Sequence, residues 1–86
     1  MPAEKENSAK TKLRLQEIFR EVFDDEKLVI APRMTARDIE DWDSFAQINL
    51  VIGCEKAFKI HFEISEIIGL ETVGDMIDLI ERKRLA

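Results

Sequence analysis

Residues 41–58 read DWDSFAQINLVIGCEKAF, and the fold of this 86-residue chain depends on them. They predict a helix with Ser44 as its N-cap, because a serine hydroxyl can accept a hydrogen bond from a free amide of the first turn. Apolar residues follow at once from Phe45 with the three- and four-residue steps of a helix. The serine is therefore expected at the point where a loop turns into a helix.

The apolar residues of this helix fall on two different parts of its surface. One set is expected to face the core and consists of Leu50, Val51, Cys54, Ala57 and Phe58. The second set consists of Phe45, Ile48 and Ile52, and three polar residues are interspersed with it: Asn49, Glu55 and Lys56. This second set is either a surface for a partner or is covered by another helix or loop, and periodicity alone leaves both open.

The composition is that of one small globular domain, with 45% hydrophobic and 36% charged residues. The net charge of −5 argues against nucleic acid as a partner. No segment approaches the ~20 apolar residues of a membrane-spanning helix, so we expect no membrane insertion. The single cysteine and the polar N-terminus, which lacks the apolar run of a signal peptide, favour a cytoplasmic location.

The N-terminal part predicts a tail, a helix and a long loop. Residues 1–8 are expected to form a flexible tail ahead of a single domain over residues 9–86. The first helix is expected to start near Ser8 or Thr11 and to end at Asp24, and its core stripe consists of Leu15, Ile18, Phe19, Val22 and Phe23. About twenty residues then lead to Ser44, and ordered loops of this length are often functional.

Two more helices are expected after the central one. Residues 63–68 predict one or two helical turns that end at Gly69. The last helix opens at Thr72, and Asp75 three residues later forms a variant of the capping box with it. Three longer helices and a short one predict an all-α four-helix bundle.

No catalytic or metal site is predicted. A catalytic serine needs a general base held against it, but the only histidine, His61, lies at least ~20 Å from Ser44 at 1.5 Å per helical residue. A calcium-binding loop is not predicted, because Phe45 and Ala46 stand where such a loop needs a ligand residue and the turn glycine. Cys54 lies on the core side of its helix, so we expect an inert thiol. A small hydrolase is therefore a poor interpretation of the chain.

The stretch around the serine resembles the signature of the acyl carrier proteins. Asp43, Ser44 and Phe45 correspond to the Asp-Ser-Leu of that family, and the helix that follows ends in Glu55-x-x-Phe58, like the Glu-x-x-Phe of the family. The resemblance extends over roughly residues 13–82. Phe62 corresponds to an apolar residue that follows the helix in the family, and Leu70 to the end of a short helix. Thr72-Val73 corresponds to a Thr-Val pair.

The resemblance implies a carrier that catalyses nothing itself. Ser44 would be the attachment site of 4′-phosphopantetheine, added by a separate phosphopantetheinyl transferase, and Asp43 would help at that step near the metal ion of the transferase. The thiol of this arm would carry an acyl group as a thioester between acyl-loading and acyl-transferring enzymes. We expect a monomer. A short acyl chain would be sheltered among Leu50, Cys54, Phe62, Ile67 and Met76.

The resemblance also implies a docking face on the helix that follows the serine. Carried over by position, this face consists of Phe45, Ile48, Asn49, Ile52, Glu55 and Lys56. Asn49 and Lys56 stand where carriers of fatty acid synthesis usually have acids, which favours a specialised lipid or polyketide-type pathway. Gly53 stands where the family often has alanine, at a cost of about 1 kcal/mol in helix propensity.

Two alternatives stay open. A peptidyl or aminoacyl carrier protein would use the same arm with a different cargo, although Asp43 and the absence of a Gly-Gly pair before the serine favour an acyl carrier. A non-covalent helical interaction module would bind its partner on the same apolar set. In that module Ser44 would be a plain helix cap.

Overall fold

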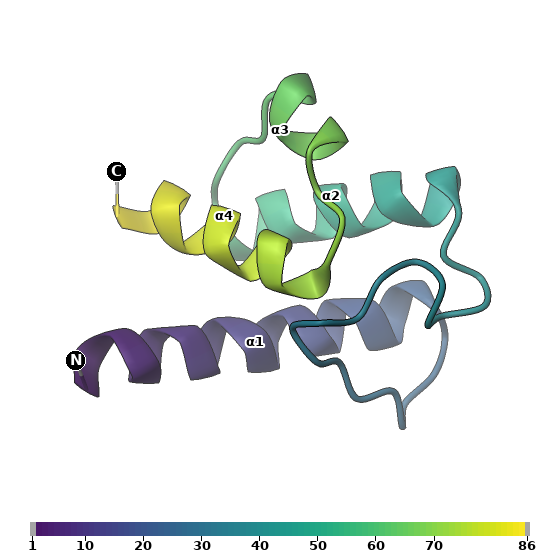
Figure 1. Cartoon of the computed structure of the whole chain (residues 1–86), viewed down its shortest axis with the longest axis horizontal. Helices are drawn as coiled ribbons and strands as arrows, with labels where there is room; N and C mark the ends of the chain where they lie inside the picture. The colour runs from purple at the N-terminus through teal and green to yellow at the C-terminus, as the bar shows by residue number, and fades with distance from the viewer. Residues whose placement is uncertain (1, 86) are drawn as a thin grey trace.

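Four helices make up the computed structural model, which describes the backbone of residues 2–85 and the side chains of residues 9–84. They are α1 (Pro2–Val22), α2 (Ser44–Phe58), α3 (Ile64–Ile68) and α4 (Val73–Leu85), and the described residues contain no strand. Figure 1 shows α2 and α4 lying along α1, with the short α3 above them at the top of the view. The predicted all-α bundle of three longer helices and one short helix is confirmed.

The first helix begins earlier than predicted. It starts at Pro2, so the expected start near Ser8 or Thr11 is wrong. Proline suits the first position of a helix, because it has no N–H that would lack a partner there. The flexibility of residues 1–8 and the domain bounds 9–86 stay predictions.

The core forms where α1, α2 and α4 meet. The predicted stripe of α1 is confirmed, since Leu15, Ile18 and Phe19 are buried and the rest of the stripe packs against them. The core side of α2 is confirmed in the same way by the burial of Leu50 and Cys54. From α4 the core receives Val73, Met76, Ile77, Leu79 and Ile80.

Gly53 allows α1 and α2 to come close together. A Cβ atom at this position would lie 2.8 Å from Cγ2 of Ile18, so even alanine would force that side chain to shift. The close approach explains why a residue of low helix propensity stands in the middle of α2. The sequence by itself offered no account of it.

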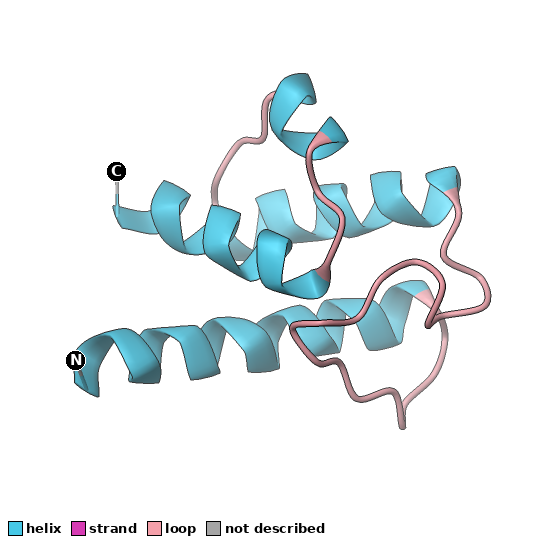
Figure 2. Cartoon of the chain, viewed as in Figure 1, coloured by secondary structure: helices cyan, strands magenta, loops and turns pink. Residues whose placement is uncertain are grey.

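The long loop between α1 and α2 is one of the pink segments of Figure 2. Hydrogen bonds fix it to α1. The Ile30 N–H donates to Oε1 of Gln16 at 3.0 Å, and Nε of Arg20 donates to the Leu28 carbonyl at 2.7 Å. Ile30 and Ile39 are buried in the core. The loop is therefore an ordered part of the fold.

The same loop is also bound to the start of α4. The Val73 N–H donates to the Met34 carbonyl at 2.9 Å, and the Gly74 N–H donates to the Pro32 carbonyl at 2.7 Å. A Cβ atom on Gly74 would lie 3.0 Å from that Pro32 oxygen. A glycine at this position therefore permits the close contact between loop and helix.

The predicted capping box of α4 is confirmed. The Asp75 N–H donates to Oγ1 of Thr72 at 3.0 Å, and the Thr72 N–H donates back to Oδ2 of Asp75 at 3.1 Å. Hydrogen bonds from the backbone of Glu71 and Thr72 lower the pKa of the Asp75 carboxyl group. The short helix α3 begins one residue later than predicted, with Glu63 as its N-cap.

No helix in residues 2–85 combines the length and the apolar character that crossing a membrane requires. The cytoplasmic location stays a prediction.

Candidate functional site

Ser44 is the first residue of α2, and Asp43 rather than Ser44 is the N-cap. Oδ1 of Asp43 accepts a hydrogen bond from the Ala46 N–H at 2.9 Å. The predicted cap is therefore wrong by one residue. Aspartate caps a helix as well as serine does. Asp43 has an extended backbone conformation, from which its side chain reaches an amide of the first turn. As a result, the exposed Ser44 is free of the capping role.

The residues before the serine form a tight turn. The Trp42 N–H donates to the Ile39 carbonyl at 3.1 Å, and the Asp43 N–H donates to the Asp41 carbonyl at 3.0 Å. One turn into α2, the Gln47 N–H donates to the Asp43 carbonyl at 2.9 Å. Ser44 thus has an ordered turn on one side and a capped helix on the other.

The Trp42 side chain fastens this turn to the bundle. Its ring lies edge-on to Phe19 of α1 at a centroid distance of 5.2 Å, and Phe23 is 6.3 Å away. Its Nε1–H donates to Oε1 of Gln47 at 2.7 Å. The sequence alone did not predict this contact with α1, because it depends on the tertiary fold.

The second apolar set of α2 is exposed to solvent. The exposed fractions of Phe45, Ile48 and Ile52 are 78%, 56% and 43%. The alternative that another helix or loop covers this set is therefore wrong for the chain by itself. Asn49 and Lys56 are exposed beside it.

Glu55 differs from the other residues of the predicted docking face, because it is half-buried and has partners within the chain. Its Oε2 accepts the Phe62 N–H at 2.9 Å and lies 3.2 Å from Nδ1 of His61. Glu55 therefore holds the connector that follows α2. His61 is mostly exposed, as expected for a connector residue.

Acidic residues lie before the serine, and a basic residue lies at the far end of α2. Exposed acids precede Ser44 in the loop, at Asp38, Glu40 and Asp41, while α2 has no acid in its first turn. Lys56 is the basic residue in the last turn of α2. The free amides of the helix N-terminus point toward the region of Ser44, where they favour a negatively charged group.

The described residues offer no metal centre, since no three or more of their His, Cys, Asp or Glu side chains form a suitable group. Burial raises the pKa of the Cys54 thiol to about 12, and Glu55 adds to that shift. At neutral pH this thiol is therefore protonated and inert, in line with the prediction.

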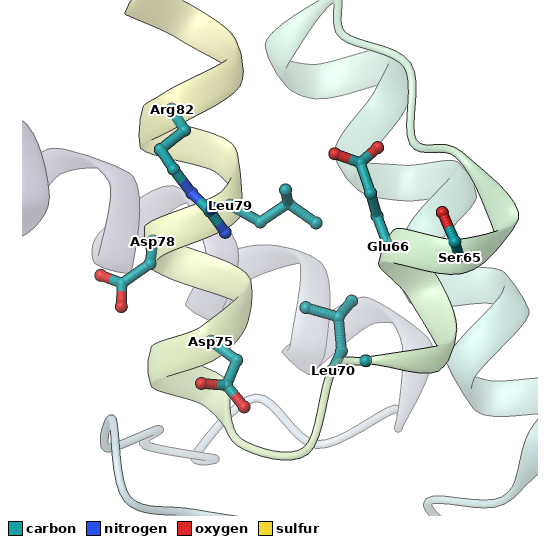
Figure 3. A pocket seen from close by; sticks show the side chains of 8 residues that line it. Ser65, Glu66, Leu70, Asp75, Asp78, Leu79 and Arg82 are labelled. Atoms are coloured by element: carbon teal, nitrogen blue, oxygen red, sulfur yellow. The ribbon is translucent and has the colours of Figure 1, made fainter.

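A cleft of about 300 Å³ lies between α3 and α4, and the sequence did not predict it. Figure 3 shows Leu79 extending from α4 toward α3, with Glu66 on the α3 side. Nζ of Lys83 lies 2.6 Å from Oε1 of Glu66 and joins the two helices, and the hydrogen bond from Lys83 lowers the pKa of Glu66. Opposite charges on separate helices give no sequence signal of their pairing. Of the residues predicted to shelter an acyl chain, four are buried core residues: Leu50, Cys54, Phe62 and Met76.

Comparison with known proteins gives the family. No protein-family profile matches the chain. A curated acyl carrier protein of Acidothermus cellulolyticus is 32% identical over 66 residues, which cover 77% of this chain and 79% of that protein. The chain belongs to the acyl carrier proteins. The family predicted from the residues around Ser44 is therefore confirmed.

A solved structure agrees with this assignment. The solution structure of the holo acyl carrier protein of Geobacter metallireducens matches with a TM-score of 0.80 and 41% identity, covering 85% of this chain and 84% of that one. The four-helix bundle is thus that of an acyl carrier protein. Acyl carrier proteins are carriers and not enzymes, and they interact with enzymes that handle acyl groups. This acyl carrier protein is likewise a carrier.

Proposed function

We propose that Ser44 carries a 4′-phosphopantetheine arm, and that this chain presents an acyl group on it to partner enzymes. When bound, the arm supplies a thiol that holds the acyl group as a thioester. The position of Ser44 is the observation that carries the proposal. It is exposed at the first position of α2, and the cap bond is made by Asp43 instead.

The surroundings of Ser44 fit the phosphodiester of such an arm. Free amides and the dipole at the start of α2 favour a negative group there. The related Geobacter protein was solved in its holo form, which supports the same attachment here. Asp43 uses Oδ1 for the cap, and in this proposal its second carboxylate oxygen assists a docked phosphopantetheinyl transferase near the metal ion of that enzyme.

The partners would dock on the exposed face of α2. Its apolar centre is formed by Phe45, Ile48 and Ile52, and its polar members are Asn49, Glu55 and Lys56. Acids in the loop before Ser44 would steer basic partner surfaces toward the serine. Asn49 and Lys56 stand on this face where carriers of fatty acid synthesis usually have acids, which favours partners of a specialised lipid or polyketide-type pathway over those of standard fatty acid synthesis.

The test is the intact mass of the protein after incubation with coenzyme A and a broad-specificity phosphopantetheinyl transferase. We expect a gain of one arm in the wild type and no gain in Ser44→Ala. A known carrier protein serves as the positive control for the transferase. If the control gains an arm and the wild-type chain does not, the proposal is contradicted.

The exposed apolar set of α2 also suits a second candidate function, a module that binds a helix of another protein without covalent modification. The same experiment separates the two. Binding that survives Ser44→Ala, in a chain that gains no arm, would favour the interaction module.

A further inference from the structure

The residues on either side of Ser44 are connected by a bond between two side chains. We infer that Trp42 and Gln47 are positioning residues, which hold Ser44 in place for attachment of its arm. This inference rests on the proposed function. It adds two residues to the site that do not belong to the serine motif or to the docking face.

Three hydrogen bonds join the residues just before Ser44 to residues just after it. The Asp43 carboxylate accepts from the Ala46 N–H at 2.9 Å, and the Asp43 carbonyl accepts from the Gln47 N–H at 2.9 Å. The third is the 2.7 Å bond from the indole Nε1–H of Trp42 to Oε1 of Gln47. Ser44 and Phe45 lie between the two residues joined by the shortest-range of these bonds, Asp43 and Ala46, and both are exposed.

The third bond differs from the other two because it extends beyond the helix. The first two are local cap bonds that start most helices in a similar way. The Trp42 ring, however, packs against Phe19 of α1 and against Phe23, which directly follows that helix. The bond to Gln47 therefore joins the first turn of α2 to a side chain that is anchored on another helix.

Such an anchor matters for a group-transfer reaction. Attachment of the arm requires the Ser44 oxygen to attack the pantetheine-bearing phosphorus of coenzyme A in the active site of the transferase. The diphosphate bond of coenzyme A breaks, 3′,5′-ADP leaves and the hydroxyl proton is lost. A misplacement of about 1 Å can cost a factor of about 100 in the rate of such a step. Without the indole bond, the first turn of α2 keeps its cap but loses its link to the Trp42 ring, which stays packed on α1. The hydroxyl would then spend less time in the reactive position, although the docking face of α2 is unchanged.

The test measures kcat and KM of a phosphopantetheinyl transferase with this protein as its substrate. Trp42→Phe removes the indole N–H and keeps an aromatic ring, and Gln47→Leu removes the acceptor at a half-buried position of α2. We expect each variant to lower kcat about tenfold with KM within about twofold of the wild type, as for a loss of orientation. Gln47→Glu retains an acceptor and should keep most of the rate. The kcat of the double variant should be no lower than that of either single variant, because all three lose the same bond between Trp42 and Gln47.

Gln16→Leu provides the control. It removes the acceptor of the Ile30 N–H and so weakens the attachment of the same loop to α1 at a place distant in sequence from Ser44. Its thermal midpoint should fall while kcat stays at the wild-type value. Wild-type kcat in Trp42→Phe and Gln47→Leu would overturn the inference, and so would an equal loss in Gln16→Leu. A wild-type chain that gains no arm would overturn the proposed function and this inference together.

Discussion

At the scale of single residues, the division of roles between Asp43 and Ser44 decides what the site can do. Both residue types cap helices, and the structure gives the cap to Asp43. The serine hydroxyl is thereby left for chemistry. Mutation of the two neighbours should therefore separate stability from modification.

The first prediction concerns this division. Asp43→Ala should lower the free energy of unfolding by about 1 kcal/mol, the usual cost of a lost cap, whereas Asp43→Asn should keep it because asparagine caps equally well. Ser44→Ala should leave stability unchanged. Urea unfolding followed by far-UV circular dichroism measures all three. If Ser44→Ala lowered the free energy of unfolding and Asp43→Ala did not, Ser44 rather than Asp43 would be the N-cap.

Asp43→Asn also tests the role of the charge. It keeps the cap but removes the carboxylate that the proposed function places near the metal ion of the transferase. We therefore expect slower attachment of the arm in a protein of normal stability. Wild-type loading of this variant would limit Asp43 to a structural role.

At the scale of elements, α2 has two apolar sides with different functions. The buried side joins the core, and the exposed side provides the surface proposed for docking. Phe45→Glu or Ile48→Glu should raise the KM of the transferase at least about tenfold, since burial of one such side chain contributes about 1.5–3 kcal/mol. Thermal unfolding should stay unchanged because both residues are exposed.

Val29 provides the matched control for this prediction. It is an apolar loop residue with 64% of its surface exposed, and it does not belong to the docking face. Val29→Glu should leave KM at the wild-type value. An equal effect of Val29→Glu and Phe45→Glu would indicate a response to net charge rather than to a specific surface.

The contact between α1 and α2 gives a third prediction. Gly53→Ala gains about 1 kcal/mol of helix propensity, but its Cβ atom would lie 2.8 Å from Ile18 Cγ2. Overpacking of a core costs about 1–3 kcal/mol, so we expect net destabilisation of about 1 kcal/mol in urea unfolding. Gly69→Ala is the control, because its Cβ atom would meet only atoms at 3.7 Å. A Gly53→Ala protein more stable than the wild type would contradict the close packing.

The elements also show which features the sequence could predict. The helices α2 and α4 have clear apolar periodicity and good capping residues, and both were predicted with starts close to those observed. The start of α1 was missed because residues 2–7 are polar, and a polar segment can be a tail or a solvated helix. The cap of α2 was misplaced because two good capping residues are adjacent, and helix ends are uncertain by one or two residues.

Features that depend on tertiary packing could not be predicted. The packing of Trp42 on Phe19, the cleft beside Leu79 and the pairing of Lys83 with Glu66 each join segments whose approach is set by the whole bundle. The exposure of Phe45 was an open question for the same reason. Periodicity places it on the second side of its helix, but only the fold determines whether another element covers that side.

At the scale of the whole molecule, the proposed site and one stabilising network lie at opposite ends of the bundle. Figure 1 shows both chain ends on the left, whereas α2 begins on the right. Near the chain ends, the buried Thr11 donates to Oε1 of Glu81 at 2.8 Å and accepts from Nη1 of Arg84 at 3.2 Å. Arg84 in turn lies over the Phe58 ring, 5.5 Å from its centroid. This network joins α1, α2 and α4 far from Ser44.

The last prediction follows from this separation. Thr11→Val keeps the shape of the buried side chain but removes its hydroxyl, so the free energy of unfolding should fall by about 1–2 kcal/mol. Glu81→Gln keeps the acceptor for Thr11 and should cost less. The rate of arm attachment, measured at a temperature where each variant is folded, should equal that of the wild type. A slower rate in folded Thr11→Val would mean that the two ends of the bundle are coupled, because the variant touches neither the turn before Ser44 nor the exposed side of α2.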